Sequence, residues 1–213
     1  MSATDVAAAP PAMELPSFYA DVPSIIVRDA LADTLGAAAG GCLHYRYVDA
    51  VKLAGHSCPT VAGAWLMTRA ALAHLYPTDI PRRGEMRVEL REPQESGVTG
   101  VIASIAGLVT GAAGPGGFQG LAGRHGRRNL LAFGQPMRGE LRVTRLDTGR
   151  SVEVSHHPQA VARPPALAQL MQAALAPDAD QAVRAAFATG WQDWVRCMLV
   201  EHADDPALVS LQE

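Results

Sequence analysis

Hydrophobic and polar residues alternate with two different periods along the chain, and the two periods predict both helices and strands. Between residues 60 and 75, apolar and small residues recur every three or four positions, which is the spacing of one face of a helix. In a later segment, Met86, Val88 and Leu90 alternate with charged residues, as they do in a strand that has one covered face. The chain therefore contains both kinds of element.

The same criteria predict the remaining elements. Helices are expected over residues 24–35, 48–53, 60–75, 97–109, 165–175, 178–200 and 206–211. Strands are expected over residues 42–47, 86–90, 129–133, 140–146 and 151–155, with the last two joined as a hairpin across residues 147–150. These elements indicate an α+β fold, in which a mostly antiparallel sheet of four or five strands packs with helices.

Composition divides the chain into three parts. Residues 1–22 are rich in alanine and proline, which predicts a poorly ordered N-terminal segment, except where Leu15, Phe18 and Tyr19 could dock on the rest of the protein. Residues 23–161 form the α+β domain. The proline pair at residues 164–165 marks a linker, after which residues 162–213 are expected to form a C-terminal helical extension.

Length, charge and cysteine content exclude several classes of protein. The 213 residues are 48% hydrophobic, enough for one sizeable core, and contain no run of eighteen apolar residues that would span a membrane. A net charge of −3 and 5% aromatic residues argue against nucleic-acid binding. Three widely spaced cysteines do not suggest a disulfide framework, and the N-terminus lacks the pattern of a secretory signal. A cytoplasmic protein is expected.

The segment from Gly55 to Cys58 carries the clearest chemical signal. Gly55 is expected to end one helix and Pro59 to begin the next, so that His56 and Cys58 lie just before a helix N-terminus. Exposed backbone N–H groups at that position favour a thiolate, which binds metals or attacks electrophiles. An imidazole and a thiolate make half of a tetrahedral zinc site. The alternative is that Cys58 is a small buried hydrophobic residue and His56 a hydrogen-bonded turn residue.

The sequence Gly-His-Ser-Cys-Pro at residues 55–59 resembles the Gly-His-x-Cys-Pro motif of proteins related to the E component of formylmethanofuran dehydrogenase. The glycine-rich run after Thr110, followed by Gly123, Arg124, Asn129 and Leu130, is similar to the second conserved block of that family. The resemblance covers about half of the chain and implies an α+β fold, a metal site and a homodimer. Ala54 and Ala112 stand where many members have a further histidine or cysteine, so only His56 and Cys58 correspond directly.

Two ligands rarely hold zinc tightly, so a third is expected from His125, His44, Cys42 or a partner subunit. His125 is the first choice, because the glycines around it would let its loop approach the motif. Paired His156 and His157 are interpreted as surface residues. The glycine-rich segment including Gly116 and Gly117 is interpreted as a mobile loop beside the site, with a plain structural turn as the alternative.

Arginines cluster around His125, and two of them, Arg124 and Arg127, are candidates for holding a small anionic ligand. A solvated surface is the alternative for this cluster. Two functions follow from the motif. The first is a metal-binding protein of the formylmethanofuran dehydrogenase E-component type, with zinc or another transition metal ion in an open site that binds a small anionic molecule. The second is a metal-free enzyme with Cys58 as nucleophile and a histidine as base.

Overall fold

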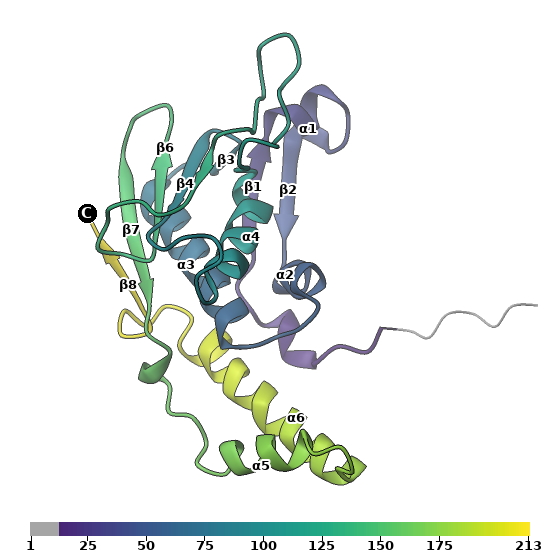
Figure 1. The fold of residues 1–213 in the computed structure, drawn as a ribbon. Coiled ribbons are helices and arrows are strands. Elements are labelled where there is room, and N and C mark those ends of the chain that lie inside the picture. Colours follow the sequence, from purple (N-terminus) through teal and green to yellow (C-terminus); the bar gives the residue numbers. More distant parts are fainter. Residues whose placement is uncertain (1–12) are drawn as a thin grey trace, which may run out of the picture.

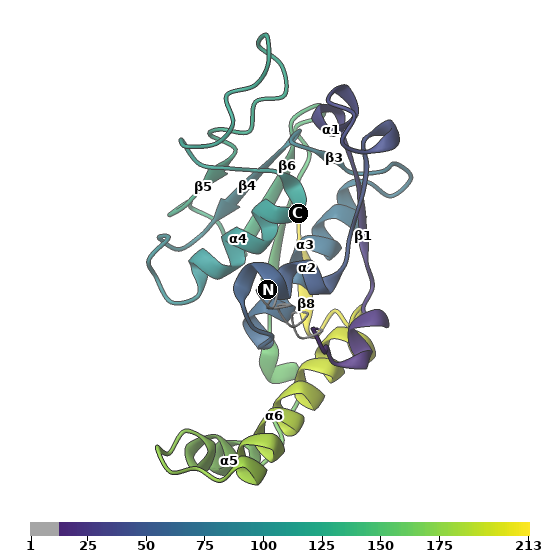
Figure 2. The ribbon, with the colours of Figure 1, turned by 90° about the vertical axis from the view of Figure 1, so that its right-hand side faces the viewer.

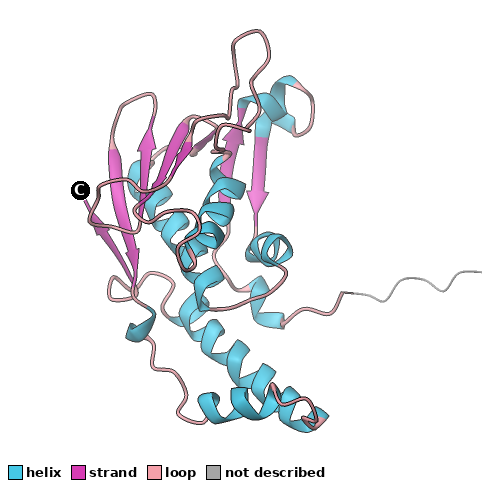
Figure 3. Cartoon of the chain, in the orientation of Figure 1, coloured by secondary structure: helices cyan, strands magenta, loops and turns pink. Residues whose placement is uncertain are grey.

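The fold was analysed in a computed structural model that describes residues 13–213. Its eight strands form two sheets (Figures 1 and 3). The smaller sheet has the order β2-β1-β3 and consists of β1 (Ile25–Asp29), β2 (Cys42–Tyr45) and β3 (Arg82–Arg83). The larger has the order β5-β4-β6-β7-β8, with β4 (Met86–Leu90), β5 (Leu131–Ala132), β6 (Leu141–Arg145), β7 (Ser151–His156) and β8 (Val209–Gln212). All pairs are antiparallel except β1 with β3 and β4 with β5.

Six α-helices complete the fold: α1 (Ala30–Thr34), α2 (Tyr47–Ala54), α3 (Pro59–Leu75), α4 (Thr99–Thr110), α5 (Leu167–Ala174) and α6 (Gln181–Arg196). Short 3-10 turns lie at Ser17–Ala20, Ala39–Gly41 and Pro158–Ala160, and a π-helical turn at Cys197–Glu201 follows α6. The predicted α+β class is confirmed. None of the helices in residues 13–213 has the length and apolar content needed to cross a bilayer.

Helix α3 is the centre of the molecule. Its residues from Val61 to Thr68 are all buried, because α4 packs on one side of the helix and strands β6, β7 and β8 on another. A helix buried around its whole circumference belongs to a core rather than to a surface. The predicted helix over residues 60–75 is therefore confirmed, and it positions the residues that precede Pro59.

The prediction of a helix over residues 24–35 is wrong in its first half. Ile25, Val27 and Asp29 are buried and alternate with exposed residues, which is the period of a strand. Three successive β-branched residues favour strand β1, and the helix begins only after Asp29, whose carboxylate accepts the N–H groups of Leu31 and Ala32. The chain thus changes from strand to helix at an aspartate cap.

The predicted helix over residues 206–211 is also wrong. Val209–Gln212 forms strand β8, which pairs with β7 at the edge of the larger sheet. The segment after residue 162 is therefore not purely helical, because its end belongs to the sheet of the preceding region. Helices α5 and α6 pack against each other and extend away from the sheets (Figures 1 and 2).

The N-terminal segment predicted to be poorly ordered covers residues 1–22. Its first twelve residues lie outside the described part of the chain. Of the rest, Phe18 and Tyr19 lie in a 3-10 turn and are buried, and the Tyr19 ring packs edge to face on Tyr47. Phe18 and Tyr19 are therefore part of the core, whereas Ser17 and Ala20 are exposed.

Candidate metal-binding and nucleophile site

The turn of Gly55, His56, Ser57 and Cys58, called here the His-Ser-Cys turn, connects α2 to α3 as the sequence predicts. Gly55 has φ of 76° and ends α2 in the left-handed conformation that glycine adopts without strain. Cys58 is the N-cap of α3 and Pro59 its first residue, where the missing proline N–H costs nothing. His56 is exposed and Cys58 is half-buried.

The His56 and Cys58 side chains are in contact. Cys58 Sγ lies 3.3 Å from His56 Nε2, and the other ring nitrogen, Nδ1, lies 2.9 Å from the carbonyl oxygen of Ala54. A carbonyl oxygen only accepts, so Nδ1 is the nitrogen that donates to it. The lone pair of Nε2 is then directed at the sulfur, or at any group that the two atoms share.

Ser57, between the two, is buried and held by three hydrogen bonds. Its hydroxyl lies 2.9 Å from the Tyr47 hydroxyl. Its carbonyl accepts from Trp191 Nε1 at 3.0 Å and from Gln192 Nε2 at 3.2 Å. Burial raises the pKa of Tyr47, so its hydroxyl stays protonated at neutral pH. Helix α6, which lies near the C-terminal end of the sequence, therefore holds the His-Ser-Cys turn in place through hydrogen bonds to the Ser57 carbonyl.

Sequence reasoning missed Tyr47, Trp191 and Gln192 as supports of the site. Val183, Phe187 and Trp191 recur at helical spacing, which indicates only that one face of α6 is packed. No periodic pattern in the sequence identifies the backbone carbonyl to which a tryptophan indole N–H will donate. An indole N–H on a packed helical face does require an acceptor, and that requirement is the one signal available from the sequence.

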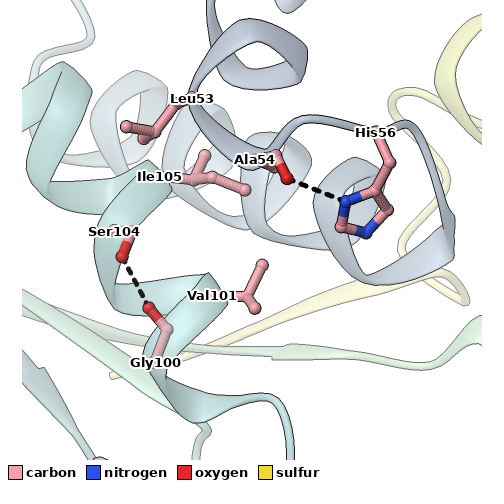
Figure 4. Close-up of a pocket in the computed structure, with 7 residues that line it drawn as sticks. All are labelled: Leu53, Ala54, His56, Gly100, Val101, Ser104 and Ile105. Carbon is pink, nitrogen blue, oxygen red and sulfur yellow. Dashed lines mark hydrogen bonds between the residues drawn. The ribbon is translucent and has the colours of Figure 1, made fainter.

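A pocket of about 240 Å³ adjoins His56 (Figure 4). Leu53, Ala54 and His56 line one side, and the N-terminal half of α4 lines the other with Gly100, Val101, Ser104 and Ile105. The Ser104 hydroxyl donates to the Gly100 carbonyl at 2.8 Å. The pocket therefore offers mostly apolar walls, with the imidazole as its ionisable group.

The third ligands predicted within the chain, His125, His44 and Cys42, do not gather with His56 and Cys58. Among residues 13–213, no three side chains of His, Cys, Asp or Glu gather closely enough to hold a metal ion. His44 and Cys42 are exposed on strand β2. His125 lies in the glycine-rich loop, residues 111–130, which follows the C-terminal end of α4, whereas His56 faces the N-terminal half of that helix. Twelve helical residues span about 18 Å.

Arg127 is not available to bind an anionic ligand, because the structure gives it another role. Its guanidinium is buried, and Nη2 lies 2.6 Å from Asp29 Oδ1, while Arg83 Nη1 lies 2.8 Å from Asp29 Oδ2. The Arg127 guanidinium also lies against Gly84, where any side chain would overlap it. Arg127 thus anchors the glycine-rich loop to strand β1.

The other predicted ligand-binding residues of the loop lie apart from the His-Ser-Cys turn. Arg124 and Gly116 are exposed, and Gly117 is half-buried. A Cβ at Gly117 would collide with the backbone of Arg128, so the loop needs glycine there for close packing. Backbone bonds from Ala113 to Arg127 and from Arg127 to Phe118 close the loop on itself. This favours a structural turn over an element of the site.

The interpretation of paired surface histidines is wrong for His156. Its Nε2 atom is buried and has no hydrogen-bond partner within the described residues, and burial lowers the pKa of the ring to about 4. His157 is half-buried, with Nε2 2.9 Å from the Ser210 hydroxyl of β8. Its partner lies on a strand that sequence reasoning took for a helix.

Comparisons with known proteins give the chain no family. No family model matches it, and no curated protein matches it. The resemblance to the formylmethanofuran dehydrogenase E-component family therefore rests on residues 55–59 and on the weaker glycine-rich block alone.

Proposed function

We propose that the protein binds a transition metal ion, most suitably zinc, through His56 Nε2 and Cys58 Sγ. The observation that supports this proposal is the 3.3 Å separation of these two atoms. Zinc bonds of about 2.0 Å to nitrogen and 2.3 Å to sulfur in tetrahedral geometry place the two ligand atoms about 3.5 Å apart. The separation of the two atoms is therefore close to that of two ligands on one zinc ion.

The surroundings of His56 also support a ligand role. Metal-binding histidines usually donate their second N–H to a carbonyl or carboxylate, which fixes the tautomer and the ring orientation. His56 Nδ1 has the Ala54 carbonyl at 2.9 Å for this purpose. The intervening Ser57 is held by Tyr47, Trp191 and Gln192, so the segment that carries both ligands is rigid.

The remaining coordination positions would be open to water, to a small molecule or to a second copy of the chain. No third His, Cys, Asp or Glu from residues 13–213 gathers at the pair. No arginine lines the pocket beside His56. A small anion that entered it would therefore have the metal ion as its positively charged partner. A homodimer that joined two turns would instead supply two histidines and two cysteines, which is a common structural zinc set. A cytoplasmic member of the formylmethanofuran dehydrogenase E-component family remains our overall proposal.

Elemental analysis combined with sedimentation tests this proposal. We expect about one zinc per subunit for an open site, or one per two subunits for a shared one. His56→Ala and Cys58→Ala should lose the metal, whereas His125→Ala and His44→Ala should retain it and serve as matched controls. Retention of metal by both His56→Ala and Cys58→Ala would rule out this site.

The second candidate function is a metal-free enzyme in which Cys58 is the nucleophile and His56 the base. The same contact supports it, because a thiol next to an oriented imidazole is the arrangement of a nucleophile and its base. The Ala54 carbonyl acts as the third, orienting group. Iodoacetamide labelling would separate the two functions. Fast Cys58 alkylation that is unaffected by zinc or a chelator favours the nucleophile, whereas protection by zinc favours the ligand.

A further inference from the structure

Strand β8 forms an open edge of the larger sheet. The order β5-β4-β6-β7-β8 places it last, and among the described strands it pairs with β7 alone (Figure 1). Its four residues, Val-Ser-Leu-Gln, include no proline and no charged side chain. Proteins usually protect an edge strand with one of these or with a bulge, because its backbone groups can pair with another chain. The edge of β8 is therefore able to accept a further strand.

The backbone groups that face the open edge belong to Leu211. The N–H of His157 on the β7 side donates to the Leu208 carbonyl at 2.8 Å. Backbone groups of successive residues in a strand point to alternate sides, so Ser210 and Gln212 also direct theirs toward β7. Leu211, which lies between them, directs its N–H and its C=O away from the sheet. It therefore offers one donor and one acceptor to a neighbouring strand.

A pocket of about 280 Å³ lies beside this edge. It is largely apolar and is lined by Val209 and Leu211 of β8, by Ala70, Ala73 and His74 of α3, and by the turn at residues 203–206. No residue of β7 lines it, so it lies on the outer side of β8. Leu211 is 42% exposed there, and Ala73 is exposed as well. A strand added beside β8 would place alternate side chains over this pocket.

Carboxylates surround the pocket. Asp204 lies 2.6 Å from Arg69, whereas Asp205 and Glu213 have histidines as their partners. The side chains of Asp204 and Glu213 are 79% and 76% exposed. With the histidines counted as neutral, three carboxylates and one arginine leave this region negative within the described part of the chain. A second copy of β8 would bring the same carboxylates with it, whereas a basic segment has the complementary charge.

We propose that β8 binds an extended segment of a partner protein, in which apolar and polar residues alternate and which carries a lysine or arginine. The segment adds a sixth strand to the larger sheet and pairs with the backbone of Leu211. One of its apolar side chains covers the pocket, and its cation faces Asp204. In this mode of recognition the main-chain bonds supply affinity and the pocket selects the side chain. The proposal is independent of metal binding at His56 and Cys58.

A fluorescently labelled, blocked hexapeptide of sequence Lys-Val-Thr-Val-Thr-Val tests the proposal by anisotropy. We expect saturable binding that weakens as salt is added, because part of the attraction is between exposed charges. The peptide with glutamate in place of lysine should bind more weakly, and the peptide with an N-methylated backbone should not bind. The amide of Leu211 should exchange rapidly with solvent in the free protein and become protected in the complex.

Two pairs of variants separate the backbone contact from the pocket. Leu211→Pro removes the N–H at the open edge but not the bonds toward β7, and it should bind about fivefold more weakly than Leu211→Ala, which keeps the N–H. Ala73→Arg fills the pocket and should weaken binding by about tenfold or more. Ala185→Arg makes the same change at an exposed position of α6 and should bind as the wild type does.

The wild-type measurements alone can overturn the proposal, even if a variant does not fold. No saturable binding of the lysine peptide, equal binding of the N-methylated peptide, or saturation that leaves the Leu211 amide unprotected would each do so. A dimer of the protein alone, seen by sedimentation and accompanied by a protected Leu211 amide, would assign the edge to a second copy instead. Wild-type affinity in both folded Leu211→Pro and folded Ala73→Arg would also contradict the proposal.

Discussion

The His-Ser-Cys turn and the glycine-rich loop both follow a helix that ends at a left-handed glycine, Gly55 in one case and Gly111 in the other. In the turn, the reactive side chains contact each other and face outward, while the buried Ser57 takes the structural bonds. In the loop, one of the two arginines expected to bind a ligand, Arg127, is itself the structural anchor. A cluster of reactive residue types is therefore weak evidence for a site until the fold shows which of them remain free.

Removing the anchor of the loop is the change with the largest expected effect. Arg127→Ala leaves Asp29 buried with Arg83 as its remaining partner. Leaving a buried charge without a partner typically destabilises a protein by about 3 kcal/mol or more, and the remaining bond from Arg83 reduces that cost here. Urea unfolding should show this loss, whereas Arg128→Ala, an exposed neighbour, should unfold as the wild type does. Equal stability of the two variants would mean that the loop does not depend on this ion pair.

Acidification should weaken the ion pairs that anchor the glycine-rich loop to Asp29. Burial alone would raise the pKa of Asp29, but the hydrogen bond from Arg83 and the charge of Arg127 outweigh it and leave the pKa lowered. A lowered folded-state pKa contributes stability that is complete above the unfolded value of about 3.9 and is lost as the pH falls through the folded value. The loss is smaller than that caused by Arg127→Ala, because a protonated Asp29 can still accept hydrogen bonds.

Hydrogen exchange of residues 111–130 measured from pH 5 down to pH 2 would detect this weakening. In Asp29→Asn the same amides should show no acid-dependent change beyond the intrinsic exchange rate. Loop protection that falls with pH equally in both proteins would assign the effect to another carboxylate.

The support of the turn by α6 should have a moderate effect. Trp191→Phe keeps an aromatic ring beside Trp194 but removes the indole N–H that donates to the Ser57 carbonyl. One net hydrogen bond contributes about 1 kcal/mol to stability, and Gln192 still donates to the same carbonyl. If the turn holds a metal ion, zinc affinity should also fall by about tenfold, as it does when groups that orient ligands are removed. Competition with a zinc indicator checks this, and Arg184→Ala, at an exposed position on the same helix, is the control.

The smallest effect is expected for Arg124→Ala. Arg124 is exposed, and its side chain makes no ion pair with the residues that the structure describes. Surface changes of this kind usually alter stability by less than about 0.5 kcal/mol. Thermal melts of the variant, with and without phosphate, should overlay those of the wild type. A phosphate-dependent stabilisation that only the wild type shows would restore the loop as an anion site.

What the sequence predicted well depends on residues close together in the chain. The helix of residues 60–75, the hairpin of β6 and β7, and the positions of Gly55, Cys58 and Pro59 all follow from local periodicity and from turn chemistry. Strand β8 was missed because its conformation comes from pairing with β7, which lies more than fifty residues earlier. Strand β1 could have been predicted, since three adjacent β-branched residues precede Asp29.

The residues around the candidate site were harder to predict for the same reason. The contact between His56 and Cys58 spans two residues, so it follows from the motif itself. The bonds from Trp191 and Gln192 to Ser57 span more than 130 residues and depend on how α6 docks. His125 was expected at the turn because its loop contains many glycines, yet ion pairing of Arg127 with Asp29 holds that loop at the other end of α4.

The long separation between Ser57 and its two α6 donors has a consequence for biosynthesis. Trp191 and Gln192 lie 134 and 135 residues after Ser57. His56 and Cys58 leave the ribosome before α6 has been translated, so the bonds from Trp191 and Gln192 to the Ser57 carbonyl cannot yet form. In the nascent chain, His56 and Cys58 therefore lie on a segment that lacks its hydrogen bonds to α6. The turn reaches its final conformation only after α6 has been synthesised.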